Sequence, residues 1–175
     1  MSQEMIASRP HMPGYGIQDA ESGVGLLPWS HVDEQMTAAR NYWISTTRPD
    51  GRPHAAPIWG VWLEGALYFG TGTTSRKGRN MAHQPWIVVN LESGDDAVIV
   101  EGSVERVADR AVLEAVNAVY GPKYAYYPLG EAGDQPYDEP FYCLRPQVAF
   151  AWIESDFPNT ATRWVRRDPT GEIYG

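Results

Sequence analysis

Three short strand-like segments follow one another in the first half of the chain, and tight turns separate them. The first, residues 42–47, is rich in aromatic and β-branched residues and runs into Arg48-Pro49-Asp50-Gly51, where proline fixes φ and glycine accepts a positive φ. A second turn at Glu64-Gly65 separates the next segment, residues 53–63, from the third, residues 66–71. Because turns this short join antiparallel neighbours, the pattern predicts a three-stranded meander.

The rest of the chain adds strands and helices without regular alternation. Apolar runs and alternating patterns predict further strands over residues 86–91, 97–107, 141–144, 148–153 and 162–166. Helices are expected over residues 31–40, over residues 75–83, and from Asp109 to the Gly121-Pro122 pair. The first helix follows Ser30-His31-Val32-Asp33, which is similar to a capping box. We therefore expect a mainly β fold, in which six or seven short strands form a closed antiparallel barrel with flanking helices.

The length and the proline and glycine pattern predict one domain preceded by an arm. A chain of 175 residues can bury a core as a single unit. Residues 1–29 are interrupted by proline and glycine and have little periodicity, so we expect an extended arm there and a single domain over residues 30–175. Tyr15, Leu27 and Trp29 suggest an arm that lies on protein; the alternative is a disordered tail.

The turn between the third strand and the second helix has the composition of an anion site. It combines glycines, hydroxyls and cations, namely Gly70, Thr71, Gly72, Thr73, Thr74, Ser75, Arg76, Lys77 and Arg79. The first turn of a helix leaves backbone N–H groups unpaired and carries the positive end of the helix dipole, which together suit a phosphate. The alternative is an ordinary capped surface helix with solvated cations. The turn is not a P-loop, because the Gly-Lys-Ser/Thr order is absent.

Composition excludes several classes of protein. A net charge of −8 and a sequence pI of about 4.9 disfavour a general nucleic-acid surface, so the cations after the turn form a local cluster. No run approaches the roughly 20 apolar residues of a membrane span, and the single cysteine, Cys143, fits a reducing compartment. We expect a cytoplasmic protein with no nucleic-acid or membrane partner. No histidine or cysteine spacing fits a metal motif, so no metal site is expected.

The order of these motifs resembles that of the pyridoxamine 5′-phosphate oxidase-like split-barrel flavoproteins. More narrowly, the chain is similar to their actinobacterial branch that uses the deazaflavin coenzyme F-420. The similarity spans about residues 13–155 and rests on short motifs taken in order, namely Gly14-Tyr15-Gly16, Leu26-Leu27-Pro28-Trp29, Tyr42 to Thr47, Arg48 to His54, Pro57 to Trp62, and Ser75-Arg76-Lys77. The resemblance implies a homodimer with the cofactor at the subunit interface.

The resemblance also implies two halves of a cofactor site. In the family a Ser-Arg-Lys triplet grips the cofactor phosphate, and Ser75, Arg76 and Lys77 match it. The neighbouring positions expected to contribute are Thr71, Gly72, Thr73 and Asn80. The preceding strand lies along the flavin or deazaflavin ring, which would place Pro57, Ile58, Trp59 and Gly60 against it, with backbone N–H groups bonding its electron-accepting edge.

Departures from the family pattern bear on which cofactor binds. Oxidases that bind flavin mononucleotide (FMN) carry an Arg and a Lys on the second strand, where this chain has Ala55, Ala56, Val61 and Trp62. They also carry a Gln at the position of about Ala97. These differences favour F-420 over FMN as the cofactor. They also argue against a pyridoxamine phosphate oxidase activity. Binding of no redox cofactor is the third alternative.

No catalytic residue stands out. His54, Glu101 and Tyr126 are weak candidates for proton transfer, and a structural role is the alternative for each. Hydride transfer needs no protein nucleophile, because the cofactor carries the reaction. We therefore expect an oxidoreductase that uses F-420 to reduce a small planar unsaturated acceptor. The alternatives are an FMN-dependent oxidase or reductase, and a non-catalytic barrel that binds a cofactor or a haem-like ligand.

Overall fold

The computed structural model describes residues 4–17, 23–137 and 139–167, and within them the fold is mainly antiparallel β. The strands are β1 (Met5–Ser8), β2 (Tyr42–Thr47), β3 (Pro53–Ile58), β4 (Val61–Leu63), β5 (Ala66–Gly70), β6 (Trp86–Asn90), β7 (Asp96–Arg106), β8 (Phe141–Leu144), β9 (Val148–Ile153) and β10 (Thr162–Arg166). The helices are α1 (Trp29–Ala38), α2 (Arg76–His83), α3 (Arg110–Tyr124) and α4 (Phe157–Thr160), with a 3-10 turn at Glu154–Asp156.

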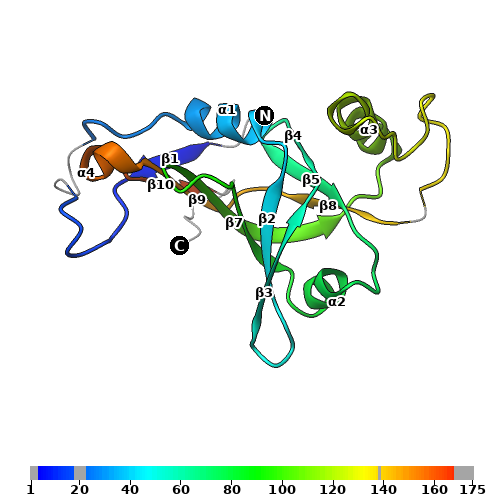
Figure 1. Cartoon of the computed structure of the whole chain (residues 1–175), viewed down its shortest axis with the longest axis horizontal. Coiled ribbons are helices and arrows are strands. Elements are labelled where there is room, and N and C mark those ends of the chain that lie inside the picture. The colour runs from blue at the N-terminus through cyan, green and yellow to red at the C-terminus, as the bar shows by residue number, and fades with distance from the viewer. Residues whose placement is uncertain (1–3, 18–22, 138, 168–175) are drawn as a thin grey trace.

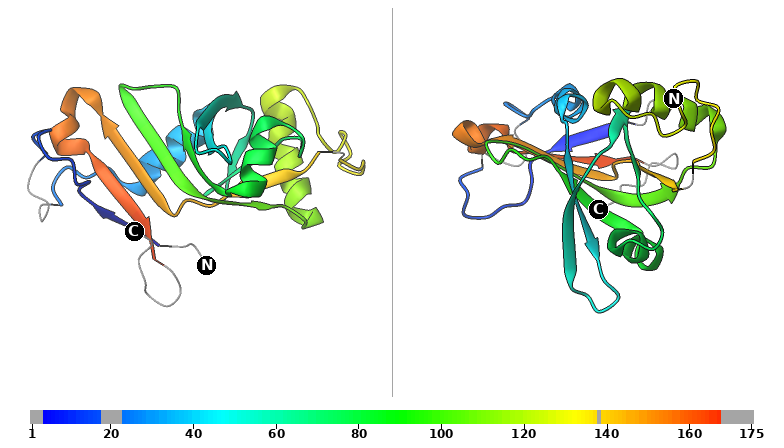
Figure 2. Two further views of the ribbon diagram at one scale, coloured as in Figure 1. Left: turned by 90° about the horizontal axis from the view of Figure 1, so that it is seen from below. Right: turned by 45° about the vertical axis from the view of Figure 1, so that its right-hand side comes forward.

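Seven of the strands form the barrel (Figures 1 and 2). Antiparallel pairing runs β3-β2-β6-β7 on one side and β4-β5-β8-β7 on the other, so β7 joins both sheets. The chain itself connects β3 to β4 across the remaining gap through Trp59 and Gly60. The expected antiparallel split barrel of six or seven strands with flanking helices is confirmed.

The return strand expected over residues 53–63 is divided into β3 and β4 at Gly60. A Cβ at Gly60 would lie 2.9 Å from the carbonyl oxygen of Tyr68, so only glycine lets the chain pass this close to β5. The bend places β3 in one sheet and β4 in the other.

The expected N-terminal arm contributes a strand. Its residues 1–3 and 18–22 lie outside the described residues, as do residue 138 and residues 168–175 of the expected domain. β1 pairs with β10, and β10 pairs with β9, which extends the sheet beyond the barrel. Arg9 holds the next segment in place, because its buried guanidinium donates to the carbonyl oxygens of Val24, Asn159 and Ala161.

Two helix ends differ from expectation. α1 begins at Trp29 after Pro28 without a side-chain cap, and the Asp33 carboxylate instead accepts a hydrogen bond from the indole Nε1 of Trp62 at 2.8 Å. The predicted capping box is therefore wrong, because the buried indole N–H needs that acceptor. α3 is capped by Asp109 as expected, but it continues through Pro122 to Tyr124 and is followed by Ala125 in the left-handed conformation.

Two apolar clusters pack against opposite faces of β5. Leu67 and Phe69 point into the barrel core, whereas Tyr68 points toward α3 and packs in the second cluster with Val116 and Tyr120. This alternation follows from the period-2 geometry of a strand whose two faces are both covered.

Leu144 lies where the barrel closes, since it pairs with Leu67 of β5 and with Val104 of β7. Its side chain has no exposed surface. We expect Leu144→Ala to lower the free energy of unfolding by about 2 to 5 kcal/mol, measured by urea denaturation, because it leaves a cavity at the seam. Val119→Ala, at an exposed position of α3, serves as the control and should change little. Equal losses in both variants would contradict this account of the closure.

Candidate functional site

The turn before α2 is a tightly folded, capped helix start. Ser75 caps α2, because its Oγ accepts from the backbone N–H of Gly78 at 3.0 Å. The same Oγ lies 3.0 Å from Oγ1 of the buried Thr71. A Cβ at Gly78 would lie 2.3 Å from the carbonyl oxygen of Gly72, so the turn folds this tightly only with glycine at position 78. The predicted cap and helix are confirmed.

Arg76 and Lys77 leave both backbone and side-chain donors free. Neither backbone N–H has a hydrogen-bond acceptor among the described residues, as expected for the first two positions of a helix. Neither side chain forms an ion pair with a described carboxylate. Arg79, in contrast, donates to the carbonyl oxygen of Thr74 at 2.7 Å and braces the turn. The two free N–H groups and two cations therefore suit a phosphate.

The other expected contributors to the turn differ in accessibility. Thr73 is exposed and Gly72 is half-buried, so both can face a ligand. Asn80 has no exposed surface, and its Nδ2 donates to Oγ1 of Thr46 at 2.9 Å. Asn80 is thus positioned to anchor α2 on β2, and a direct contact with a ligand does not follow from its geometry.

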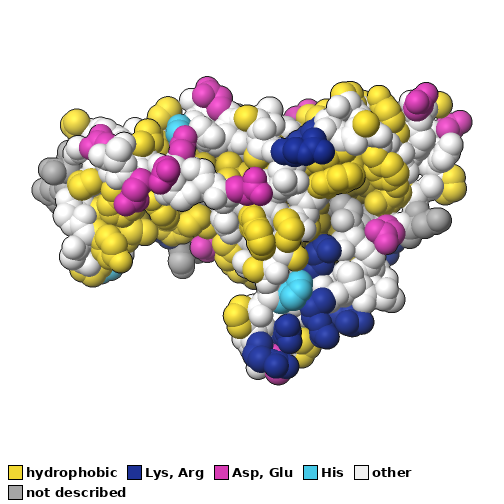
Figure 3. All heavy atoms as spheres, viewed as in Figure 1, with side chains coloured by type: hydrophobic (Ala, Val, Ile, Leu, Met, Phe, Trp, Pro, Cys, Tyr) yellow, Lys and Arg dark blue, Asp and Glu magenta, His cyan; other side chains and the backbone are white. Residues whose placement is uncertain are grey.

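A basic surface surrounds the turn. The carboxylate of Asp50, at the tip of the β2–β3 hairpin, accepts hydrogen bonds from Arg52, which chiefly lowers its pKa, and the nearby charges of Arg48 and Arg76 lower it further. Arg76 therefore lies within electrostatic range of the hairpin. Figure 3 shows Lys and Arg side chains gathered over this projecting part of the molecule, on a chain whose net charge is −8.

The segment expected to hold the cofactor ring is the bend between β3 and β4. Pro57 is exposed, Ile58 is buried, and Trp59 is 45% exposed and stacked on Tyr124, with ring centroids 4.7 Å apart. Among the described residues β3 pairs only with β2, so its second edge carries unpaired backbone groups. The N–H of Gly60 donates to the Tyr124 hydroxyl at 3.0 Å, and Pro57 has no N–H. Ile58 is the register partner of Tyr42, and the alternation that begins at the Arg48–Arg52 hydrogen bond directs its N–H toward β2. Trp59 is therefore the backbone donor of this segment left for a ring.

Sequence reasoning missed Lys123 and Tyr124, which hold this bend. The Lys123 ammonium donates to the carbonyl oxygen of Gly60 at 2.9 Å and to the Tyr42 hydroxyl at 3.0 Å. It also lies over the Tyr42 and Tyr124 rings, at 4.8 and 5.3 Å from their centroids. Burial, with a smaller contribution from Arg40, lowers the pKa of Lys123 to about 8. Both residues were missed because the Gly121-Pro122 pair predicts a helix end before them, whereas α3 continues to Tyr124.

The outer face of the sheet carries an apolar pocket of about 250 Å³. Its lining comes from the β6–β7 hairpin and from β9, and includes Asn90, Ala97, Ile99 and Trp152. Ala97, at or near which the resemblance places the glutamine of FMN oxidases, is 5% exposed at the pocket wall. The pocket suits a flat apolar group.

The structure does not bring the three candidate proton-transfer residues together. His54 lies in β3, with its Nδ1 3.5 Å from Oγ1 of Thr46. Glu101 lies in β7 between Val88 and Val148 of the neighbouring strands. Tyr126 is 51% exposed in the loop after α3 and contacts Tyr120. His54 is therefore the candidate linked to the turn, through Thr46 and Asn80.

The described residues contain neither a cluster of metal-ligating side chains nor a helix that could span a membrane. They contain no group of three or more His, Cys, Asp or Glu side chains that could hold a metal ion. No helix among residues 4–17, 23–137 and 139–167 is long and apolar enough to cross a membrane.

Solved structures with this fold include proteins that bind different cofactors. An F-420 reductase is 25% identical, with a TM-score of 0.53 over 67% of this chain and 94% of that one. A haem-binding protein of Mycobacterium smegmatis is 20% identical, with a TM-score of 0.58 over 74% of this chain and 56% of that one. A pyridoxamine 5′-phosphate oxidase-related, FMN-binding protein of Nostoc punctiforme is 18% identical, with a TM-score of 0.54 over 82% and 89%. At 20% and 18% identity, the last two similarities show only that these proteins share the fold.

No curated protein matches the chain, but a family model does. The model describes pyridoxamine 5′-phosphate oxidase and matches residues 29–153, which run from the start of α1 to the end of β9. That range contains the whole barrel, the Ser75-Arg76-Lys77 turn and the bend at Gly60. The chain therefore belongs to the pyridoxamine 5′-phosphate oxidase family of split-barrel proteins.

Proposed function

We propose that this protein is an oxidoreductase that uses the deazaflavin F-420 to transfer hydride to a small planar unsaturated acceptor. The observation that carries the proposal is the turn before α2, where the backbone N–H groups of Arg76 and Lys77 have no acceptor, and their side chains no ion-pair partner, among the described residues. These residues fit the phosphate of such a cofactor. The 25% identical F-420 reductase supports the same choice.

In the proposed reaction, the protein binds the cofactor, orients it and shields it from water. Ser75, Arg76 and Lys77 bind the phosphate, and the bend at Trp59-Gly60 offers a backbone edge and an indole face to the ring. When bound, the cofactor supplies the hydride, so no protein nucleophile is needed. His54 is our candidate for supplying the proton that completes the reduction, because it lies on β3, the strand that leads to the bend, and is linked to α2 through Thr46 and Asn80.

The choice of F-420 over FMN rests on the side chains that replace the family's cations. Val61 and Trp62 are 0% and 7% exposed and belong to the packed interior, and Ala55 and Ala56 carry no charge. The phosphate-binding cations are thus confined to the turn and the hairpin tip. An open basic surface of this kind suits a cofactor with a long anionic tail better than one held by a closed ring of arginines.

Two alternatives follow from the same geometry. An FMN-dependent oxidase or reductase is supported by the FMN-binding relative. A non-catalytic barrel that holds haem or another flat ligand is supported by the apolar pocket at Ala97 and Trp152, which none of the candidate proton-transfer residues lines. Parallel titrations with F-420, FMN and haem separate the three, because each proposal requires a different tightest ligand.

We further propose that a second copy of the chain covers the outer face of the sheet. Trp43, Asn90, Ile99 and Phe150 are register partners in turn across β2, β6, β7 and β9, so their side chains form one row on this face. Trp43 is 37% exposed, and the other three side chains are only partly buried. Three of these four side chains are apolar, and the row runs into the apolar pocket through Asn90 and Ile99. Such a surface fits an interface that shares a cofactor.

The phosphate half of the proposal is tested with Lys77→Ala. We expect a loss of about 1.5 to 3 kcal/mol in the binding of F-420, followed by tryptophan fluorescence, because one charge-assisted contact is removed. Arg110→Ala is the matched control, since it removes an exposed cation that pairs with Glu114 on α3. If the wild type and Lys77→Ala bound F-420 with equal affinity, Lys77 would not be a cofactor-binding residue.

The bend is tested through the titration of Lys123. The chain has only two lysines, Lys77 and Lys123, so ¹³Cε labelling gives two signals, and Lys123→Met identifies them. We expect a midpoint near 8 for Lys123, against an ordinary value of 10.5. Because the folded state then binds fewer protons than the unfolded chain between about pH 8 and 10.5, the contribution of Lys123 to stability rises with pH across that window.

Urea unfolding of the wild type and of Lys123→Met at pH 7 and at about pH 9.5 checks the sign. The wild type should gain stability relative to the variant at the higher pH. A midpoint near the ordinary value, or no relative gain, would mean that the ammonium does not sit in the buried position between Gly60 and Tyr42.

The interface is tested by the mass of the protein in solution. We expect a dimer by light scattering, and we expect Phe150→Glu to dissociate it, because a charge would be buried in the apolar row. Val119→Glu, on exposed α3, is the control and should leave the dimer intact. A monomeric wild-type protein at concentrations that saturate with cofactor would refute the shared site.

A further inference from the structure

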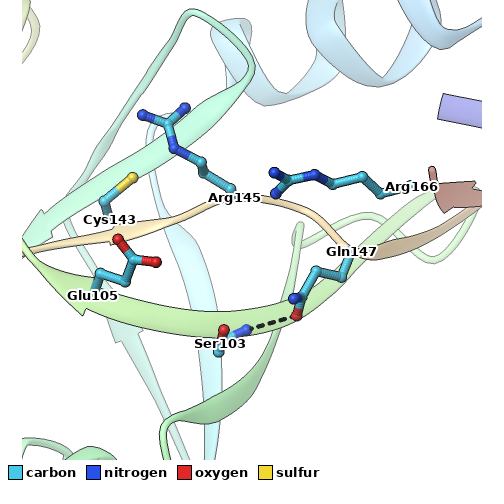
Figure 4. Close-up of a pocket in the computed structure, with 6 residues that line it drawn as sticks. All are labelled: Ser103, Glu105, Cys143, Arg145, Gln147 and Arg166. Atoms are coloured by element: carbon cyan, nitrogen blue, oxygen red, sulfur yellow. Dashed lines mark hydrogen bonds between the residues drawn. The ribbon is translucent and has the colours of Figure 1, made fainter. Parts of the chain in front are cut away.

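A polar cavity of about 240 Å³ lies on the outer face of the sheet, away from the turn and the bend. Its six lining residues come from four segments, and each presents a polar, charged or thiol group, as Figure 4 shows for Ser103, Glu105, Cys143, Arg145, Gln147 and Arg166. The volume is below the roughly 300 to 1,000 Å³ of pockets for drug-sized ligands, so a small ion or metabolite suits it.

The cavity is distinct from both halves of the proposed cofactor site. Ser103 and Glu105 alternate on β7 with the core residue Val104, so they face outward. They follow Ile99 by four and six residues, roughly 13 to 20 Å along the strand. No residue of the turn, the bend or the apolar pocket lines the cavity.

Two guanidinium groups give the cavity more positive than negative charge, because Glu105 is the one carboxylate in its lining. Neither Arg145 nor Arg166 forms an ion pair with a carboxylate of the described residues. The Nε of Arg166 is buried and has no hydrogen-bond partner among the described residues, and Arg145 makes only a 3.5 Å contact with the Tyr68 hydroxyl. A buried donor without a partner is unfavourable, so a ligand that accepts its hydrogen bond would be stabilised.

Gln147 adds a positioned neutral donor. Its Oε1 accepts from the backbone N–H of Ser103 at 3.2 Å, which leaves its amide N–H groups as donors. Its backbone is fixed on both sides, because its N–H donates to the carbonyl oxygen of Glu101 and its carbonyl accepts from the N–H of Arg166. Of the donors of this cavity, Arg166 stands on β10, and Gln147, in the short connection between β8 and β9, is held by backbone hydrogen bonds to β7 and β10.

Glu105 makes the cavity selective. It is the register partner of Cys143, and it lies on the same wall of the cavity. A carboxylate here repels a fully ionised anion but accepts a hydrogen bond from an anion that carries an O–H group. Burial raises the pKa of the Cys143 thiol, so this neighbour adds no negative charge.

We propose that this cavity binds a small oxyanion that also carries a hydroxyl donor, with Arg145, Arg166 and Gln147 bonding the anionic oxygens and Glu105 accepting from the hydroxyl. Hydrogen phosphate and a short 2-hydroxy carboxylate share this chemistry. Sulfate has a similar size and charge but no O–H group near pH 7, so it separates selective binding from simple attraction of charge.

The test is a titration of the full chain with phosphate, lactate and sulfate at constant ionic strength, followed by NMR at the Nε–H of Arg166 and the side-chain amide of Gln147. We expect saturable shifts with phosphate or lactate, and the tighter of the two identifies the source of the oxyanion. Sulfate should bind roughly tenfold or more weakly. Glu105→Gln should remove the preference, because a glutamine can donate to an anionic oxygen.

Variants of the two arginines test whether the anion binds in this cavity. Arg166→Gln and Arg145→Gln should each weaken the tighter anion roughly tenfold or more. Arg145 is exposed, so its variant remains informative if loss of Arg166 impairs folding. Lys77→Ala should leave these shifts unchanged, while it weakens any phosphate response at the amides of residues 75–79. No saturable shift at Arg166 and Gln147, or shifts that survive both arginine variants, would overturn the proposal.

Discussion

The bend at Gly60 is the constraint on which the rest of the structure depends. There the chain leaves the sheet of β2 and β3 and enters the sheet of β4 and β5, with no room for a side chain against Tyr68. Tyr124 and Lys123 bond the N–H and the carbonyl oxygen of Gly60, so α3 holds the bend from outside. These contacts compensate the backbone groups that leave the β ladder at this point. Without the bend the barrel would have neither its split nor a free edge on β3.

The two halves of the proposed cofactor site depend on this geometry in different ways. The turn before α2 is a local structure, because Ser75, Gly78 and the first helical turn determine which N–H groups remain free. The bend is a long-range structure, because its partners come from α3, more than sixty positions later in the sequence. Asn80 and Thr46 connect the halves, since their hydrogen bond joins α2 to the strand that pairs with β3.

The outer face of the sheet is organised as a gradient of polarity. Near Ile99 and Trp152 it is apolar and hollowed, which suits a flat ring or a partner subunit. Farther along β7, at Ser103 and Glu105, it becomes polar and carries two guanidinium groups. Since β7 is a single strand of 11 residues shared by both sheets, one element carries both environments. On a chain with a net charge of −8, Lys and Arg side chains gather over the hairpin with α2, and Arg145 and Arg166 line the cavity.

The sequence by itself determined the two hairpins, β2 with β3 and β4 with β5, the mainly β fold, the three helices after the arm, after β5 and after β7, and the capped turn at Ser75-Arg76-Lys77. These depend on residues close together in the chain, where turn chemistry, periodicity and capping act. Only the tertiary structure decided that Asp33 bonds Trp62 instead of capping α1, that α3 runs through Pro122, and that β3 and β4 part at Gly60. It also decided that Lys123 and Arg166 face partly buried sites, because burial and pairing across distant strands leave no local pattern.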